Sequence, residues 1–238
     1  MLKNLFFLIT AIIFSISSKA QDVPKINFMD IEDAVIKPGG DYYYPNLLER
    51  YNSFDSTLTV IDYTYIYYGF AFQKDYLVNQ PGEEKMNQLM EKGLYEEAIA
   101  ECTAILAKNP VSLEANNAMA YAMFQLKKTE SEYEPYRNRY KTFVDIIVKS
   151  GDGKDPLTSF KVIYVADEYN IMFSHFEIPE IIYRHQLVNA GYDYFKIKPS
   201  PLYKSQDIYF EIPEKLNNIH KQRAIEKAKK KAAATQAQ

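Results

Sequence analysis

The sequence has no tryptophan, one cysteine and no excess of basic residues. The single cysteine, Cys102, excludes an internal disulfide, so the stability of this 238-residue chain must come from its core. The 28 Lys and Arg residues are balanced by 31 Asp and Glu residues, for a net charge of −3. Nucleic-acid-binding proteins usually carry a strongly basic face. We therefore expect no nucleic-acid partner.

Long apolar runs are also missing, which excludes a membrane-spanning helix of the usual 18 or so apolar residues. The apolar run Leu5–Ile16 is shorter, follows Lys3 and precedes the small-x-small end Ser18-Lys19-Ala20. This pattern is typical of a secretory signal peptide cleaved after Ala20. Gln21 stands where a lipid anchor would need a cysteine. The sequence thus predicts an exported protein, periplasmic or extracellular, without a lipid anchor.

Tyrosine is the abundant aromatic residue, with 21 copies beside 14 phenylalanines. A tyrosine ring can pack against apolar groups while its hydroxyl finds a hydrogen-bond partner. A tyrosine-rich exported protein could use these rings to bind glycans or peptides. The alternative, a core built from tyrosine, is favoured because buried aromatic residues are the commoner case.

Three local structures are predicted in the first third of the mature chain. Residues 21–41 are expected to be an extended lead-in that ends in a turn at Lys37-Pro38-Gly39-Gly40. A short helix is expected over Asn46–Tyr51, after Pro45. Leu58–Tyr68 is rich in β-branched and aromatic residues, so its propensity favours a strand, with a helix packed on both sides as the alternative.

Periodicity then predicts a helical region followed by a sheet. Helices are expected over Glu83–Glu91, Tyr95–Lys108, Leu113–Gln125 and Pro135–Lys149. After the polar loop Ser150–Pro156, short segments bounded by turn residues indicate an antiparallel meander. These segments are Phe160–Val165, Tyr169–Phe176, Ile181–Val188, Tyr192–Ile197 and Ile208–Ile212.

The helical region resembles a tetratricopeptide repeat. The pattern Gly93-x-Tyr95-x-x-Ala98-Ile99, with Leu106 and Pro110, is similar to the second half of such a repeat, and Leu113–Gln125 is similar to the first helix of the next. The resemblance covers residues 79–126, about one and a half repeats. It implies a groove on one face of the first helices; its residues here would be Glu83, Asn87, Asn117 and Tyr121. The alternative is that this face packs on the sheet.

Over most of its length the chain also resembles a family of uncharacterised exported bacterial proteins, classed as a domain of unknown function. The resemblance implies export and an intact fold but no activity. The matching segments include Tyr43-Tyr44-Pro45-x-Leu47-x-x-Arg50-Tyr51, Asp55–Thr59, Tyr67–Phe70, Ser150–Gly153, Val162–Tyr169 and Gln186–Val188.

No motif of a known catalytic chemistry is complete. Gly151-Asp152-Gly153-Lys154 lacks the first glycine and the final Ser or Thr of a phosphate-binding loop, so a polar turn is favoured over a phosphate or calcium site. His175-x-Glu177 lacks the paired cysteines of a zinc deaminase. We expect no catalytic residues, metal or cofactor.

Taken together, the patterns predict an α+β protein with a tetratricopeptide-like helical region packed against a C-terminal antiparallel β-sheet. The expected organisation is a signal peptide (1–20) and a single domain (21–213). Within that domain the helices span 79–150 and the sheet spans 157–213; a basic Lys/Ala-rich tail (214–238) follows.

The function we expect is non-catalytic: an exported binding or scaffolding protein whose partner is a peptide, glycan or protein. The binding surface is expected in a tyrosine-lined cleft between helices and sheet, formed by Tyr67, Tyr68, Asn87, Asn117 and Tyr121, with Asp152 in a loop near it. One alternative is a hydrolase that uses carboxylates such as Asp152, Asp167 and Glu168. Another is a structural envelope component held by its basic tail.

Overall fold

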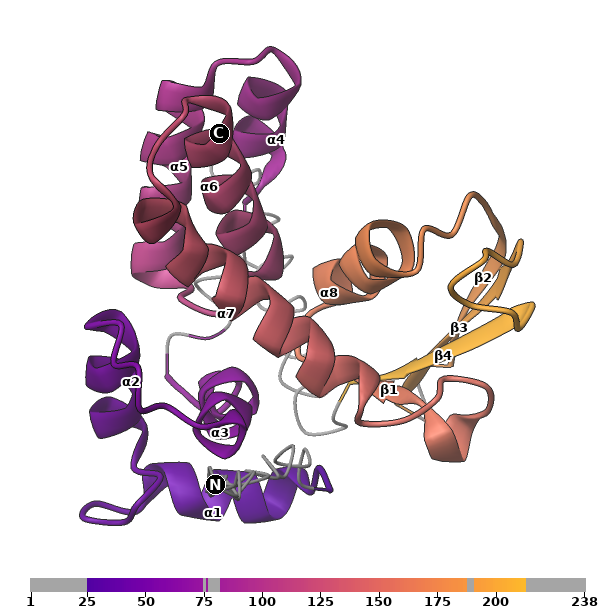
Figure 1. Ribbon diagram of the computed structural model, residues 1–238. Coiled ribbons are helices and arrows are strands. Elements are labelled where there is room, and N and C mark those ends of the chain that lie inside the picture. The colour runs from indigo at the N-terminus through magenta and orange to yellow at the C-terminus, as the bar shows by residue number, and fades with distance from the viewer. Residues whose placement is uncertain (1–24, 75, 77–81, 188–190, 213–238) are drawn as a thin grey trace, which may run out of the picture.

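The fold is α+β, with helices in the first two thirds of the chain and a sheet near its end (Figure 1). The computed structural model describes residues 25–74, 76, 82–187 and 191–212. The predicted signal peptide and basic tail lie outside these residues. None of the described helices is both long enough and apolar enough to cross a membrane. The helices are α1 (Phe28–Ile36), α2 (Tyr44–Asn52), α3 (Val60–Phe70), α4 (Glu84–Glu91), α5 (Tyr95–Lys108), α6 (Leu113–Gln125), α7 (Glu130–Val148) and α8 (Val165–Asn170).

The N-terminal segment is more helical than the sequence suggests. The expected extended lead-in is wrong, because α1 forms where Asn27 caps the chain by accepting a hydrogen bond from the backbone N–H of Met29 at 3.1 Å. Its inward side chains, Ile31 and Val35, are buried. The expected turn after it is present, and the short helix after Pro45 is confirmed as α2.

The prediction of a strand over Leu58–Tyr68 is wrong, and the alternative of a helix packed on both sides holds. Thr59 and Asp62 form a capping box that begins α3: each side chain bonds the other residue's backbone N–H. The helix packs between α1, α2 and α7, so nearly all of its faces are buried. A helix buried on every side loses the amphipathic period, which leaves only its β-branched and aromatic composition visible in the sequence.

The next three helices have nearly the expected bounds. Consecutive helices α4, α5 and α6 pack side by side, with Gly93 at φ +70° in the turn between the first two. Ser112 caps α6 by accepting a hydrogen bond from the backbone N–H of Ala115. The fourth helix, α7, begins at Glu130 rather than Pro135, since Thr129 and Glu132 form a capping box five residues earlier.

The sheet has four strands in the order β1-β4-β3-β2, formed by β1 (Phe160–Lys161), β2 (Ile181–Leu187), β3 (Tyr192–Ile197) and β4 (Asp207–Glu211). The expected antiparallel pairing holds for β2, β3 and β4, whereas β1 runs parallel to β4. Phe195, Ile208 and Phe210 point to the buried face, and α8 covers that face with Tyr169 edge-on to Phe195 at 5.8 Å.

The expected strand over Tyr169–Phe176 is wrong, because this segment continues α8 as a turn of π-helix over Ile171–His175. Ile171 and Met172 turn into the core there. The helix brings Asn170 to α6, where its side-chain amide donates a hydrogen bond to Glu114 at 2.6 Å. Burial at a helix–helix contact, rather than strand propensity, decides the structure of this segment.

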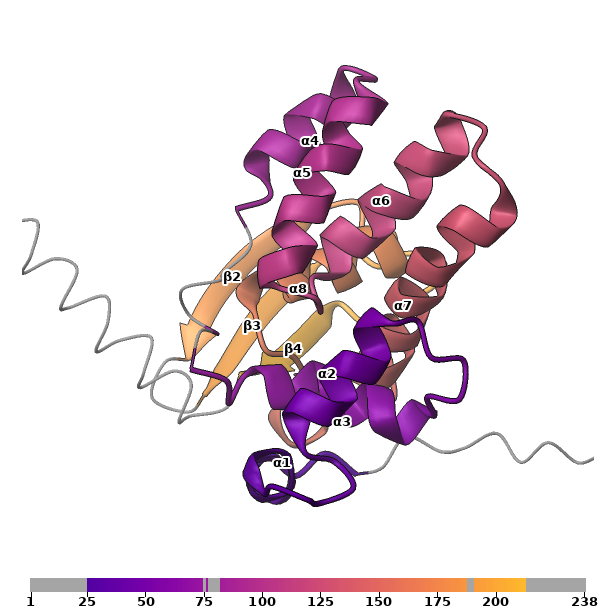
Figure 2. The same cartoon turned by 90° about the vertical axis from the view of Figure 1, so that its left-hand side faces the viewer.

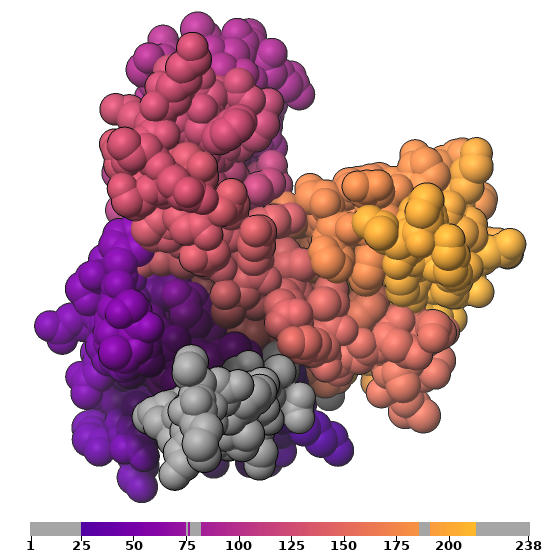
Figure 3. All heavy atoms as spheres, in the orientation of Figure 1, coloured from indigo at the N-terminus to yellow at the C-terminus, as the bar shows by residue number. Residues whose placement is uncertain are grey.

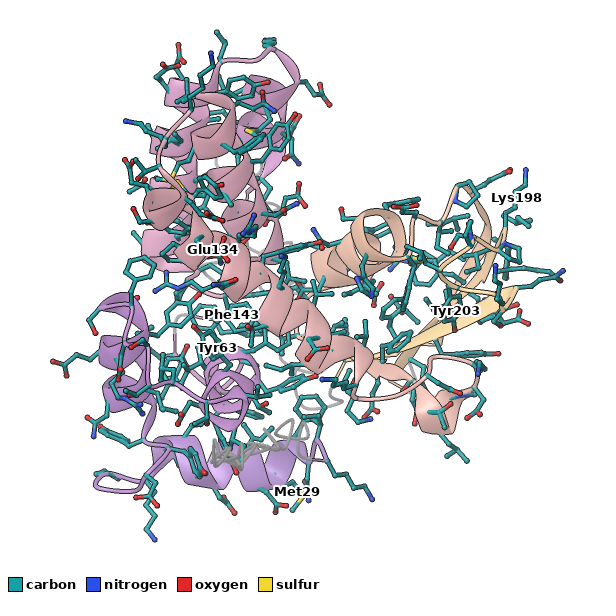
Figure 4. The ribbon with its side chains drawn as sticks, viewed as in Figure 1. Met29, Tyr63, Glu134, Phe143, Lys198 and Tyr203 are labelled. Carbon is teal, nitrogen blue, oxygen red and sulfur yellow. The ribbon has the colours of Figure 1, made fainter. Side chains whose placement is uncertain are left out.

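Two arms meet at α7 (Figure 1). Helices α4–α6 form one arm and the sheet with α8 forms the other, so the molecule has an angular outline (Figure 3). Of the N-terminal helices, α3 packs against α7, and α1 and α2 pack on α3 (Figure 2). Tyr63 of α3 and Phe143 of α7 meet between these helices, with ring centroids 5.7 Å apart (Figure 4).

Candidate functional site

A cavity of about 590 Å³ lies between α2, the end of α3 and helices α5–α7. Its wall is mainly aliphatic and aromatic, and a few polar side chains interrupt it. This combination is typical of sites for small organic ligands. The described lining residues are Tyr44, Pro45, Leu48, Asn52, Phe54, Phe70, Gln73, Lys74, Thr103, Leu106, Ala107, Lys108, Pro110, Met119, Tyr136 and Arg139.

Arg139 of α7 is a buried cation in this wall, with 6% of its surface exposed. Its guanidinium lies between two aromatic rings, with its central carbon 3.7 Å from the centroid of Tyr51 and 3.8 Å from that of Phe54. It also donates a hydrogen bond to the backbone carbonyl of Tyr51. The ring faces attract the cation and thereby offset part of the cost of removing it from water.

The last turn of α2 and the residues after it position the rings of Tyr51 and Phe54. The Tyr51 hydroxyl donates a hydrogen bond to the carbonyl of Pro110 at 2.9 Å, which ties α2 to the loop before α6. Phe54 has φ +56°, a left-handed conformation that is unusual for a bulky residue. That backbone conformation accompanies a ring that contacts Arg139 on one side and Tyr136 at 5.4 Å. The strained residue therefore lies at the cavity wall.

Tyr44 places an unsatisfied polar group behind the same wall. It is 3% exposed, and its hydroxyl has no hydrogen-bond partner among the described residues. Burial raises the pKa of this phenol well above its usual value, so the hydroxyl stays protonated. The hydroxyl oxygen has almost no accessible surface, so it lies behind the wall rather than facing the cavity, and its missing hydrogen bond costs about 1–3 kcal/mol.

A second polar feature consists of buried carboxyl groups around α8. Asp167 accepts a hydrogen bond from the Tyr67 hydroxyl at 2.6 Å, and burial raises its pKa to about 7. Glu168 is fully buried, and neither of its carboxyl oxygens has a hydrogen-bond partner in the described part of the chain. Burial and the nearby Asp193 raise the pKa of Glu168 well above its ordinary value, while the Arg184 guanidinium, 4.0 Å from its Oε2, acts in the opposite direction.

Two further carboxyl groups lie where α4 and α6 approach α8. Glu83 accepts a hydrogen bond from the Ser112 hydroxyl at 2.7 Å, and burial raises its pKa to about 7. Burial also raises the pKa of Glu114, which accepts the Asn170 bond. In the described residues no group of three or more His, Cys, Asp or Glu side chains is arranged to hold a metal ion.

The structure does not gather the predicted site residues into one cleft. Tyr67 and Tyr68 are fully buried, and their hydroxyls bond Asp167 and the carbonyl of Lys161, so these two rings lie in the core. Asp152 is exposed in the loop after α7, where it accepts a hydrogen bond from Thr158 at 2.6 Å. None of these three lines the cavity.

Three of the four predicted groove residues lie on helices of the α4–α6 arm, and the fourth, Glu83, directly precedes α4. Asn87 of α4 and Asn117 of α6 are half-buried, and neither lines the cavity. Tyr121 of α6 is 50% exposed and meets Tyr95 edge-on at 6.2 Å. The α6 face that carries Glu114 is partly covered by α8 through the Asn170 contact.

Sequence reasoning missed the cavity residues because they come from four separate parts of the chain. The partners of Arg139 lie 85 or more positions earlier, so no local spacing links them. The one local signal is Tyr44-Pro45 at the start of α2, which marks a helix start and says nothing of a ligand.

Comparisons with known proteins give a family without an assigned activity. Searches of curated proteins and of solved structures found no match to this chain. One family model, described as "Domain of unknown function (DUF4919)", matches residues 29–221. That range includes every element described above except the first residue of α1. The chain belongs to this family, the domain of unknown function DUF4919.

Proposed function

We propose that this chain is an exported, non-catalytic binding protein of the bacterial envelope, and that the cavity between α2 and α5–α7 is its binding site. The observation that carries this proposal is the cavity itself: about 590 Å³, walled mainly by apolar and aromatic side chains, with the buried Arg139 among them. Sites for small ligands commonly enclose about 300–1,000 Å³. Export rests on the signal-peptide pattern of residues 1–20.

The tetratricopeptide resemblance supports a binding role without fixing the surface. In such repeats the first helices present a groove, and Asn117 and Tyr121 keep partial exposure on α6. Because α8 covers part of that arm near Glu114, we place the primary site in the cavity rather than in the groove.

A hydrolase is the second candidate, since Asp167 and Glu168 are neighbouring carboxyl groups with raised pKa values. Neither residue lines the cavity, and Asp167 is engaged by the Tyr67 hydroxyl. Raised pKa values also result from burial alone. The binding function is therefore favoured over the catalytic one.

A thermal-shift screen tests the proposal. The purified protein is heated with fatty acids, short peptides, cell-wall fragments and glycans; a ligand at a hundred times its Kd adds about 2.7 kcal/mol, or several degrees in Tm. Ala107→Trp, which fills the cavity wall on α5, should abolish the shift. The matched control Ala100→Trp changes an exposed alanine two turns away on the same helix and should keep it. A flat screen, or equal shifts in both variants, would contradict the proposal.

A further inference from the structure

The charged side chains among the described lining residues of the cavity are all positive. Of the described residues that line it, Arg139, Lys74 and Lys108 are cationic and none is acidic. The whole chain, in contrast, has a slight excess of acidic residues. A pocket of one sign in a chain of the opposite net charge raises the local concentration of oppositely charged ligands.

The buried cation in this wall has no counter-ion. Arg139 forms no ion pair with a carboxylate in the described part of the chain, although it is almost fully buried. Its five N–H donors are only partly used, by the Tyr51 carbonyl and the Tyr63 phenol. Since Tyr51 and Phe54 cover its two faces, the remaining donors lie in the guanidinium plane, where a carboxylate is bound in bidentate fashion.

The rest of the wall fits an apolar body. Leu48, Leu106 and Met119 line the cavity from three different helices. Of the three cations in the wall Arg139 is the buried one, so a single carboxylate compensates it, whereas the two lysines are exposed and are stabilised by water. The match is therefore to a monoanion attached to an apolar group.

We propose that the cavity binds a carboxylate carried on an apolar body, with its head at Arg139 and its body against Leu48, Leu106 and Met119. This inference rests on the proposed binding function and names its ligand class. Two sources share this chemistry: a medium-chain fatty acid and the free C-terminus of an apolar peptide. Lys74 and Lys108, both exposed, attract the anion from solution.

Paired ligands that differ only in charge test the inference by titration calorimetry. Octanoate is compared with octanamide, and acetyl-Phe-Leu is compared with its C-terminal amide. At least one acid should bind about tenfold or more tightly than its own amide, since it alone pairs with the buried guanidinium. Whichever acid binds more tightly identifies the source. Equal affinity of acid and amide would overturn the carboxylate assignment while leaving the binding function intact.

Charge variants separate the head-group contact from general attraction. Lys108→Gln should weaken octanoate roughly threefold and leave octanamide unchanged. The control Lys92→Gln removes an exposed lysine at the end of α4, outside the cavity wall, and should change neither. Arg139→Gln should abolish the preference for octanoate over octanamide. If circular dichroism shows that this variant is unfolded, the comparison of Lys108→Gln with Lys92→Gln tests the site instead. Equal effects of Lys108→Gln and Lys92→Gln would contradict a site at the cavity.

If no acid or amide binds, while another compound from the screen gives a shift that Ala107→Trp abolishes, the carboxylate inference fails alone. If the entire screen is also flat, the binding function fails with it.

Discussion

At the residue scale, aromatic side chains hold two buried ionisable groups, Arg139 and Asp167, whereas the buried Asp193 forms an ion pair with Arg184 at 2.7 Å. Arg139 lies between Tyr51 and Phe54, and Asp167 is held by the Tyr67 hydroxyl. Tyr68 donates a hydrogen bond to the carbonyl of Lys161 in β1, and Tyr76 donates one to the carbonyl of Ile163 just after that strand. In these contacts the tyrosine rings fill the core and their hydroxyls satisfy buried acceptors. This role accounts for part of the high tyrosine content of 21 residues.

The stacking of Phe54 on Arg139 gives the first prediction. Phe54→Leu keeps an apolar side chain but removes the ring face, so the free energy of unfolding should fall by about 1–2 kcal/mol. Urea denaturation measures the loss. Phe173→Leu is the control, because Phe173 is 46% exposed against 44% for Phe54, and no cation packs on it in the described contacts. Equal losses in the two variants would show that the cation–ring contact adds no stability.

The sequence could not predict which residues pack around Arg139. The local pattern predicts that Tyr51 and Arg139 lie on helices but not that they meet, since 88 positions separate them. Cys102 is different: its place on the apolar stripe of α5 predicts burial, and it is fully buried, with its thiol pKa raised to about 12.

At the element scale, the sequence predicts the amphipathic helices other than α1 and does not predict the fully buried helices. Helices α5 and α6 have the predicted bounds because one face is apolar and their ends carry Lys108-Asn109-Pro110 and Ser112. Helix α3 and the α8 region were predicted as strands, since burial on several sides removes the helical period. The β-branched and aromatic residues that remain are typical of strands in either case.

The loop between α7 and β1 gives a prediction at this scale. Gly153 has φ +66°, and a Cβ atom there would lie 2.4 Å from the Phe160 ring, while the Gly153 carbonyl accepts a hydrogen bond from Tyr209 of β4. Gly153→Ala should therefore destabilise the protein by about 2–4 kcal/mol, through strain and a clash with the sheet. Thermal unfolding gives the value.

Gly39→Ala is the matched control, because Gly39 has φ +76° with no atom near its Cβ position. Gly39→Ala should lower the free energy of unfolding by about 1 kcal/mol, which is the cost of the left-handed backbone conformation alone. Should both substitutions cost the same, the packing of the loop against Phe160 contributes nothing to stability.

At the scale of the whole molecule, α7 joins the N-terminal helices, the α4–α6 arm and the sheet. The cavity lies on one flank of this junction, and the buried carboxyl groups lie at the contact of α8 with the arm. Tertiary arrangement of this kind depends on contacts between distant segments, so the sequence predicts the class α+β but neither the angle between the arms nor the cavity (Figure 3).

The buried carboxyl groups make stability depend on pH. The pKa of Asp167 is raised from 3.8 to about 7 on folding, so the folded state binds more protons than the unfolded state between these values. As far as this group is concerned, stability should therefore be greatest below about pH 3.8, fall as the pH rises to about 7, and level off above that pH. Glu83, with a pKa raised to about 7, acts in the same direction.

Asp167→Asn tests this dependence, because asparagine resembles the protonated acid and can still accept the Tyr67 bond. The fall in Tm between pH 5 and pH 8 should become smaller in this variant. Asp152→Asn, at an exposed carboxylate whose pKa is lowered by its Thr158 hydrogen bond, should leave the fall in place. An unchanged slope in Asp167→Asn would show that Asp167 does not ionise in this range.

The central claim is that the cavity beside Arg139 binds an apolar carboxylate. Anomalous diffraction from a crystal grown with 8-bromooctanoate tests it most directly, because bromine marks the end of the apolar chain. We predict one bromine peak among Leu48, Leu106 and Met119, with the carboxylate within hydrogen-bonding distance of the Arg139 guanidinium. A bromine peak elsewhere on the molecule, with the cavity unoccupied, would contradict the assignment.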